Sequence, residues 1–510
     1  MGQRLVCCRS ARAYRNEYDD QGIIEDLTKT KKEINGTVFY STNQTFFSLQ
    51  LAHADLDDAE SMLDSTSSQL EYEADPSEST NGIAATGGRK DIVSTGIFQT
   101  QLEGTKVAKV QDRPNGFPGY LTKEQLEICL SFRQWLKEQS DENPIYSDMV
   151  YYYSVEEEAY AICRYLRARK FNLKDTQELV ESLADVWKEG QKHGFYPTAA
   201  EALGGESHES AFLTQFPIIM NGLTRNGCPL LYFPVKYMSI EGIECVCPMD
   251  TISKYMWHVA AHKSGNIVAK AKEEDPSRFV RMQFVALVDL DGLSISTMRR
   301  AMGEMEGCMA VLNAFPEILF SVCITNMPRF FAAFWPLISA FMDESTASKF
   351  ELYSNPVEGK KRMVELVDKN ELASDFGGNG PTTLEMASMN EDNSHKKISR
   401  QITKLLTKKL LKSHVDMTFK LERGEAASVR IYSRVSDANQ AHAVLSNSNK
   451  SEEWTIDLKR NKKEEAAKSF HRDFKTTLHG PGEYIVTVHQ KTRQVDYFLV
   501  VAEASHEDTS

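Results

Sequence analysis

Two pairs of side chains have the residue types and spacing of metal ligands. His258 and His262 are one helical turn apart, as in a zinc metalloprotease helix, but Val259 stands where that motif has its catalytic glutamate. Cys245 and Cys247 lack the second ligand pair of a structural zinc site. The sequence also shows no glycine-rich phosphate loop between a strand and a helix, and no nucleophile elbow. We therefore interpret both pairs as structural, and we expect no metal, no cofactor and no enzymatic activity.

A cluster of basic side chains is the second feature that could take part in binding or catalysis. Residues 156–171 predict a helix, and its last part contains Arg164, Arg167, Arg169 and Lys170. Cations are favourable near the negative C-terminal end of a helix. From these residues alone, complementing the helix end is the simplest interpretation.

The elements that must position such side chains centre on residues 281–353. Met282–Gly292 is an almost unbroken apolar run, which predicts a strand buried on both faces, and Ile318–Ile324 predicts a second one. A helix capped at Ser294 or Ser296 connects them. Strands separated by helices predict an α/β fold with a mostly parallel sheet.

A strongly apolar segment follows this unit. Phe330–Met342 has the length of a helix and is apolar nearly all round, although it contains Pro336. Phenylalanine, methionine and leucine between residues 282 and 342 are suited to lining a cavity for acyl chains, because methionine adapts to varied shapes. Packed core is the alternative for each residue taken singly.

The preceding part of the chain predicts helices and a hairpin. Thr122 is the expected cap of one helix, with Gln125 at the capping-box position, and Leu173–Lys192 predicts another. A strand, a tight turn and a strand are expected over 218–235, and an amphipathic helix over 250–272.

The composition bounds the class of protein. The 510 residues are 41% hydrophobic and 26% charged, which suffices for a sizeable core in two or three domains. The formal net charge of -13 argues against nucleic acid as a partner, and any contact with an anionic membrane must come from local basic patches.

The sequence has no apolar window of about 18 residues and no apolar signal-peptide core. Nine irregularly spaced cysteines suit a reducing compartment. We expect a cytoplasmic, peripherally membrane-associated protein.

The N-terminal 118 residues predict a largely disordered region. Residues 51–80 contain nine acids and no Lys or Arg, and a Ser/Thr/Asn/Gly-rich run follows. The exceptions that we expect are a helix near 56–63 and a hairpin near 38–47.

The first residues predict acylation. Gly2 suits N-myristoylation, although Val6 stands where the motif has Ser or Thr, and Cys7 and Cys8 lie beside arginines as palmitoylation sites. One acyl chain binds a membrane only marginally, so a second chain or the arginines would be needed. An unmodified N-terminus is the alternative.

A series of motifs resembles the CRAL-TRIO lipid-binding domain with its N-terminal helical extension. The similarity covers roughly residues 120–385 and keeps the family's order of motifs. The motifs are Leu166–Phe171, Gly227–Phe233, Val288–Ser294, Phe315–Glu317, the aromatic segment before Met342, and Asp375–Gly378. The resemblance implies a lipid carrier. In such a carrier a parallel sheet forms the floor of an apolar pocket, and a mobile helix, here about Pro328–Met342, acts as its gate.

The resemblance also implies lipid-binding residues. Members that bind phosphatidylinositol hold its headgroup through residues that match Arg169, Lys170, Glu317, Thr346 and Lys349. The implied pocket and gate residues are Tyr232, Phe284, Ala286, Phe330, Phe331, Phe334, Trp335 and Phe341. Cations would contact the phosphate, while the carboxylate and hydroxyl would share hydrogen bonds with the inositol ring. A surface ion pair between Glu317 and Lys349 is the simpler alternative.

One departure from the family concerns the second ligand. Members that exchange phosphatidylcholine have Ser and Thr where this chain has Phe284 and Ala286. This argues against choline-lipid exchange and leaves open another hydrophobic ligand, such as an isoprenoid or vitamin-like molecule.

The C-terminal part predicts a helix and then strands. Lys396–Lys412 places apolar residues on one side and most of its seven basic residues on the other, which predicts an amphipathic helix that lies on anionic lipid or packs as a linker. After His414 the period of two predicts a β-sandwich. Gly480–Tyr484 and the strand at Tyr497–Leu499 resemble a GOLD domain. A lipid domain followed by a GOLD domain is similar to plant patellins, which act in membrane trafficking.

These expectations define a domain plan and a function. The expected parts are a disordered region 1–118, a helical extension 119–195, a CRAL-TRIO domain 196–385, a basic helix 386–413, a GOLD-like sandwich 414–502 and a tail 503–510. The expected function is phosphatidylinositol binding and transfer that links phosphoinositide metabolism to membrane trafficking. The alternatives are a trafficking adaptor that binds a protein through the sandwich, and a carrier of another hydrophobic ligand.

Overall fold

The computed structural model describes residues 93–104, 115–205, 208–388, 398–407, 414–434, 441–459, 469–490 and 497–506. All elements below belong to the unit Ala85–Ser510. The predicted acylation sites Gly2, Cys7 and Cys8 and the elements expected near 38–47 and 56–63 lie outside the described residues.

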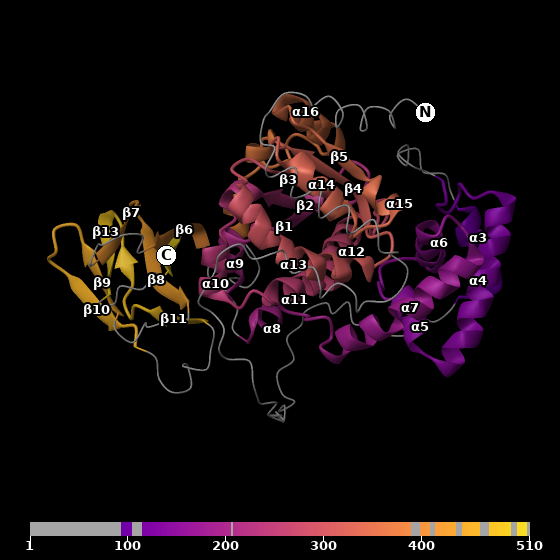
Figure 1. Ribbon diagram of the computed structural model, residues 1–510, viewed down its shortest axis with the longest axis horizontal. Helices are drawn as coiled ribbons and strands as arrows, with labels where there is room; N and C mark the ends of the chain where they lie inside the picture. Colours follow the sequence, from indigo (N-terminus) through magenta and orange to yellow (C-terminus); the bar gives the residue numbers. More distant parts are fainter. Residues whose placement is uncertain are drawn as a thin grey trace. The chain divides into compact units, whose positions relative to one another are not determined.

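A group of helices precedes the first described strand (Figure 1). Its members are α3 (Thr95–Glu103), α4 (Lys123–Glu142), α5 (Ile145–Val150), α6 (Glu158–Ala168) and α7 (Leu173–Lys192). The predicted capping box of α4 is present, because the Thr122 hydroxyl accepts the Gln125 N–H while the Gln125 side chain accepts the Thr122 N–H. Helix α3, which buries Phe98 and Leu102, is an ordered element within the region 1–118 that the sequence predicts to be largely disordered.

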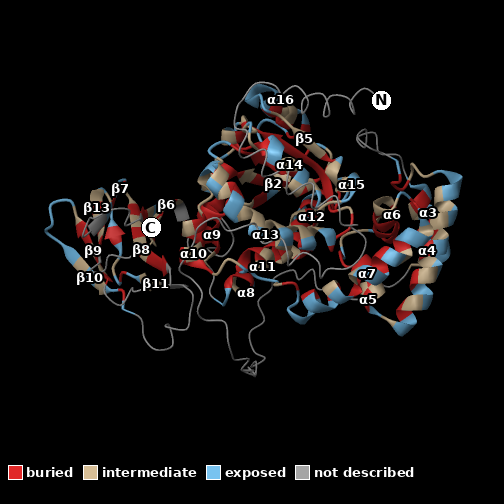
Figure 2. Cartoon of the chain, in the orientation of Figure 1, coloured by how far each residue is buried: buried red, intermediate tan, exposed pale blue. Residues whose placement is uncertain are grey.

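A mixed five-stranded sheet with the order β1-β2-β3-β4-β5 follows. Its strands are β1 (Ile219–Leu223), β2 (Pro229–Pro234), β3 (Phe284–Asp289), β4 (Leu319–Thr325) and β5 (Phe350–Leu352). Strands β1 and β2 are antiparallel, whereas β2, β3, β4 and β5 pair in parallel. Every residue of β3 and β4 is buried, as the apolar runs predict (Figure 2).

Helices connect and cover these strands. Before β3 lie α8 (Ala199–Leu203), α9 (Glu209–Gln215), the short helix η3 (Val235–Tyr237), α10 (Ile240–Val246), α11 (Thr251–His258), the π-helix η4 (Val259–Lys263) and α12 (Ser264–Glu274). After it come α13 (Ile295–Asn313), α14 (Phe331–Ser339), α15 (Glu344–Ala347), α16 (Pro356–Leu366), η5 (Ser374–Phe376) and α17 (Thr383–Ser388). Ser294 caps α13 as predicted, by accepting the Thr297 N–H. Among the described helices, none has the length and apolar character needed to cross a bilayer.

The C-terminal region consists of antiparallel strands in two sheets, β10-β9-β13-β7 and β11-β8-β14-β6, with β12 beside β8. The strands are β6 (Ile398–Thr407), β7 (His414–Leu421), β8 (Glu425–Arg434), β9 (Ala441–Asn447), β10 (Glu453–Asp457), β11 (Ser469–Asp473), β12 (Leu478–His479), β13 (Gly482–Gln490) and β14 (Tyr497–His506). Their inward side chains form one core, which contains Met417 and Phe419 from one sheet and Ile431 and Phe498 from the other.

Strand β6 overturns the prediction of a basic amphipathic helix over 396–412. Residues 398–407 pair with β14 along their length, from Thr407 opposite Tyr497 to Gln401 opposite Glu503. Leu406 enters the core of the sandwich, whereas Leu405 packs against the core of the preceding α/β domain. Two adjacent leucines facing opposite apolar surfaces suit a strand, so tertiary pairing outweighs the helical period of the sequence.

The sheet containing β8 and β14 is buried on both faces. Phe498 and Val500 point into the sandwich, while Tyr432, Leu499 and Val501 belong to the core of the α/β domain. Helix α10 contacts β8, β11 and β14, and the Cys245 thiol donates to the Tyr497 carbonyl oxygen at 3.4 Å. The α/β domain and the sandwich therefore share a hydrophobic interface.

This interface predicts that a sandwich residue stabilises the α/β domain. Leu499 is 0% exposed, so Leu499→Ala should lower the free energy of unfolding of the α/β domain by about 2–5 kcal/mol. Urea unfolding followed by tryptophan fluorescence reports mainly on this domain, because Trp187 and Trp257 lie in it. Val444→Ala, on the outward face of β9, is the control and should change little. An unchanged tryptophan transition for Leu499→Ala would contradict the shared core.

Candidate functional site

A cavity of about 460 Å³ lies where the helical extension meets the α/β domain. Its walls come from the loop before α4, from α4 itself, from the end of α6, from the starts of β3 and β4, and from the α15 region. The lining residues are Asn115, Gly116, Phe117, Gln125, Arg167, Lys170, Phe171, Gln283, Glu317, Phe320, Ser345, Ser348 and Lys349. Segments far apart in the sequence thus form one polar site.

Glu317 is the centre of the polar contacts in this cavity. Its Oε1 accepts a hydrogen bond from Lys349 Nζ at 2.7 Å, and its Oε2 accepts one from Gln283 Nε2 at 3.2 Å. The Arg167 Nε atom lies 3.7 Å from the same Oε2. One carboxylate therefore holds two cations and an amide in place.

Two of the three cations that line the cavity are buried, whereas the third, Lys170, is exposed. The side chains of Lys349 and Arg167 are 7% and 10% exposed, and that of Glu317 is 10% exposed. Burial lowers the pKa of Arg167, and the charge of Glu317 acts in the opposite direction. Since Arg167 and Lys349 carry two positive charges against the single carboxylate of Glu317, these three side chains leave a positive balance that favours an anion.

Aromatic rings form one wall of the cavity. The Arg167 guanidinium carbon lies 3.8 Å from the centre of the Phe117 ring, a cation–π distance. Gly116 permits this contact, because its φ is +80° and a Cβ atom there would lie 2.8 Å from Arg167 Cγ. The Gly116 carbonyl oxygen also accepts a hydrogen bond from Arg167 Nη1 at 3.2 Å.

Strained backbone is concentrated here. Lys170, Phe171 and Glu317 have φ values of 52°, 60° and 58°, in the left-handed region that is unfavourable for residues other than glycine. Lys170 and Phe171 end helix α6, where the Phe171 N–H donates to the Leu166 carbonyl oxygen at 2.7 Å. Such conformations persist where the surrounding structure imposes them, and they are frequent at binding sites.

The structure brings three of the five predicted headgroup residues to the cavity. Lys170, Glu317 and Lys349 line it. Arg169 does not, because it points to Asp343, with Nη1 and Oδ2 3.5 Å apart. Thr346 is likewise absent from the lining, and its backbone N–H donates to the Asp343 side chain at the start of α15.

Sequence reasoning missed Arg167 and Gln283 as site residues. Arg167 belongs to the last turn of α6, whereas Arg169 is the C-cap of that helix and Lys170, with a φ of 52°, lies beyond it. Helical periodicity therefore does not relate Arg167 to Lys170. Gln283 precedes the buried strand β3, and the sequence contains no signal that its amide meets Glu317.

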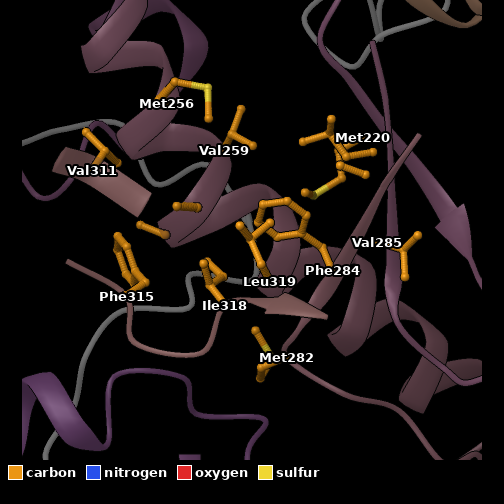
Figure 3. Close-up of a cluster of buried hydrophobic side chains, with 14 of the residues drawn as sticks. Met220, Met256, Val259, Met282, Phe284, Val285, Val311, Phe315, Ile318 and Leu319 are labelled. Atoms are coloured by element: carbon orange, nitrogen blue, oxygen red, sulfur yellow. The ribbon is translucent and has the colours of Figure 1, made fainter. Parts of the chain in front are cut away.

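Two residues expected to line the apolar pocket are packed core. Phe284 is 2% exposed and points towards Leu319 and Val259, away from Val285 (Figure 3). Tyr232 pairs with Leu287 and therefore lies on the opposite face of the sheet, where its hydroxyl donates to the Glu371 carbonyl oxygen. These two side chains hold the sheet to its neighbours.

The expected gate covers the face of the sheet that carries Ala286. Ala286, Val322 and Phe350 form one register row, and the Trp335 ring of α14 lies 5.2 Å from the Phe350 ring. Phe331 and Phe334 are on the buried side of α14, whereas Phe330, Trp335 and Phe341 are only half-buried. The Phe341 carbonyl oxygen accepts a hydrogen bond from Asn313 at the end of α13.

The two pairs with metal-ligand spacing are engaged in structural contacts. His258 Nδ1 contacts the Tyr196 carbonyl oxygen at 2.7 Å, and burial lowers the pKa of His258 to about 4. His262 Nε2 contacts the Gly194 carbonyl oxygen at 2.9 Å. Cys245 and Cys247 are buried, and burial raises the pKa of the Cys247 thiol to about 12.

Replacement of the central carboxylate tests the charge balance of the cavity. Glu317→Gln should lower the free energy of unfolding by about 3–5 kcal/mol, because two buried cations lose their counter-charge. Inorganic phosphate should then raise the melting temperature of the variant more than that of the parent, since an anion that binds the folded state stabilises it. Glu365→Gln, at a glutamate whose side chain is 53% exposed, is the control for both measurements. Equal phosphate effects in parent and variant would contradict an anion site.

Known proteins resemble this chain over its middle part. Protein real-time of Anopheles gambiae is 26% identical over 268 residues, which cover 51% of this chain and 36% of that protein. The SEC14 cytosolic factor of Yarrowia lipolytica is 21% identical over 273 residues, with coverages of 53% and 51%. Phosphatidylinositol/phosphatidylcholine transfer protein SFH12 of Arabidopsis thaliana is 22% identical over 218 residues, with coverages of 42% and 38%.

The chain spans from about a third to half of the length of these relatives. Residues 213–378 match the CRAL/TRIO domain family, and this range contains the five-stranded sheet, helix α14, Glu317 and Lys349. Arg167 and Lys170 lie in the helical extension before the match. With its α/β architecture, the segment 213–378 is therefore a CRAL/TRIO domain.

Proposed function

We propose that this protein binds phosphatidylinositol and transfers it between membranes. The observation that carries the proposal is the cavity with two buried cations, one buried carboxylate and several neutral donors, which matches a phosphate joined to a ring of hydroxyl groups. The domain family and the relatives named for phosphatidylinositol/phosphatidylcholine transfer support it.

The proposed headgroup contacts follow from the donors and acceptors of the cavity. Lys349 has three N–H donors, of which Glu317 uses one, so the others are available to a phosphate oxygen. Arg167 can add a second charge-assisted hydrogen bond, and Lys170 at the cavity edge a third. Glu317, Gln283, Ser345 and Ser348 suit the inositol hydroxyl groups.

The acyl chains impose the second requirement. A lipid with about 30 methylene groups gains roughly 25 kcal/mol from apolar burial, at ~0.8 kcal/mol each, so a carrier must supply comparable burial. We place this burial under α14, on the Ala286 face of the sheet. The half-buried side chains of Met302, Met305 and Leu312 on α13 add apolar surface. The Phe284 and Ala286 positions favour a second ligand less polar than phosphatidylcholine.

Transfer of labelled phosphatidylinositol between vesicles tests the proposal. Lys349→Ala should slow transfer about 10- to 150-fold, which corresponds to the ~1.5–3 kcal/mol of a hydrogen bond to a charged group. Lys361→Ala, an exposed lysine of α16, should leave transfer unchanged. Mass spectrometry of the co-purifying lipid should show phosphatidylinositol in the parent and its depletion in Lys349→Ala. Parent-like transfer by a folded Lys349→Ala variant would refute the proposed headgroup site.

The trafficking adaptor is the second candidate function. It is favoured by the large C-terminal sandwich. Among the described residues, the sheet β10-β9-β13-β7 contributes none to the core that the CRAL/TRIO domain shares with the other sheet, so its outward face is not used in that interface. In this case lipid occupancy would target the chain to a membrane, and a partner protein would bind the sandwich. Lipid binding by the parent without any transfer between vesicles would favour this function over that of a carrier.

A further inference from the structure

The headgroup cavity contains a buried acceptor that no described residue satisfies. Gln283 is 4% exposed and lines the cavity. Its Nε2 donates to Glu317 Oε2 at 3.2 Å, which fixes the identity of the two amide atoms because a carboxylate accepts only from the nitrogen. Gln283 Oε1 is buried and accepts no hydrogen bond from any residue that the structure describes. The amide oxygens of Gln101 and Gln401 share this property, but neither residue lines the cavity.

A buried donor in the same state lies beside the same carboxylate oxygen. Arg167 Nε is buried and makes no hydrogen bond with a described residue, since Glu317 Oε2 is 3.7 Å away. The side chain of Arg167 is 10% exposed and is held by the Phe117 ring and the Gly116 carbonyl oxygen. An unpaired buried polar atom is unfavourable and needs a physical explanation. A ligand that presents an anionic oxygen to Arg167 and a donor to Gln283 satisfies both atoms.

The charges of the cavity determine which kind of donor suits Gln283. Arg167 and Lys349 repel the ammonium group of an ethanolamine headgroup, because like charges destabilise each other strongly where water is excluded. The trimethylammonium group of choline has no N–H to donate. A hydroxyl group donates without adding a positive charge. The fitting headgroup is therefore a phosphate ester with a neighbouring hydroxyl group.

Glu317 and Gln283 respond differently to a ligand without hydroxyl groups. The carboxylate of Glu317 keeps Lys349 and Gln283 as donors whatever occupies the cavity. Gln283 Oε1, in contrast, depends on the ligand for its donor. A site built to hydrogen-bond a hydroxyl group discriminates strongly against an analogue that lacks it, because a polar group of the site is then left unpaired.

We propose that Gln283 makes the cavity selective for a polyol headgroup, with inositol as the reference, over a phosphate ester without hydroxyl groups. The proposal rests on the proposed function, because it assigns a specificity to the same headgroup site. The terminal torsion of glutamine has a broad energy profile, so the amide can turn its oxygen towards a bound hydroxyl group at low cost.

Competition between two lipids with the same phosphodiester charge tests the proposal. The protein is equilibrated with vesicles that contain equal amounts of phosphatidylinositol and phosphatidylmethanol, which has no hydroxyl group, and the bound lipid is identified by mass spectrometry. The parent should bind phosphatidylinositol in about 5- to 150-fold excess, the factor that corresponds to the ~1–3 kcal/mol of a buried polar group left unpaired. Gln283→Met, which keeps the side-chain length without the amide, should lower this ratio at least fivefold.

Two further variants separate selectivity from stability. Gln283→Glu keeps an acceptor and should retain most of the preference, although its charge weakens binding of both lipids. Gln134→Met replaces an exposed glutamine that donates to Glu138 at 2.6 Å, and it should keep the ratio of the parent. A merely structural role of Gln283 would weaken both lipids equally and leave the ratio unchanged. Gln283→Leu replaces Gln283→Met if the latter does not fold.

Soluble phosphate esters distinguish a free headgroup from a lipid. Inositol 1-phosphate should raise the melting temperature of the parent more than methyl phosphate does, and this difference should be absent in Gln283→Met. A preference in this measurement without binding of either lipid would support the selectivity and refute the proposed lipid function. Equal binding of both lipids by the parent, or a folded Gln283→Met variant with the parent's ratio, would overturn the selectivity and leave the lipid function standing. If the parent binds neither the lipids nor the soluble esters, both proposals fail.

Discussion

The contact of Glu317 with Lys349 and Arg167 is the constraint around which the site is built. Two cations with side-chain exposures of 7% and 10% would be costly in the protein interior without a counter-charge. The carboxylate provides it, but its own position needs a left-handed backbone at residue 317. The helical extension and the CRAL/TRIO domain are therefore joined by charge as well as by apolar packing, since Arg167 comes from the former and Glu317 from the latter.

The α/β architecture could be predicted from the order of the motifs and from the apolar runs. An uninterrupted apolar run such as Phe284–Asp289 is typical of a central strand, and this strand is buried throughout. Three of the five residues expected to hold a headgroup line one cavity, since their motifs lie at ends of elements that the fold brings together. The position of Arg169 outside this cavity has a physical reason. Helix α6 ends at Ala168, one residue after Arg167, and its C-cap residue Arg169 points to Asp343, a partner that lies 174 residues away in the sequence.

Strand β6 shows where local pattern fails. Its sequence fits a helix with one apolar face, yet a vacant edge of the β14 strand and apolar surfaces on both sides outweigh that preference. The apolar pocket residues show a related limit. Phe284 and Tyr232 are both hydrophobic and central, but the direction of each side chain depends on strand register, and only the paired sheet reveals that they lie on opposite faces.

The two-sided burial of β8 and β14 has a consequence for any shortened form of this protein. A chain that ended at Ser388 would keep the CRAL/TRIO sheet but would expose to water the side of α10 that contacts β8, β11 and β14, including Cys245. Exposed apolar stripes of this kind drive self-association. The sandwich thus acts as a built-in solubilising cover for the domain that precedes it.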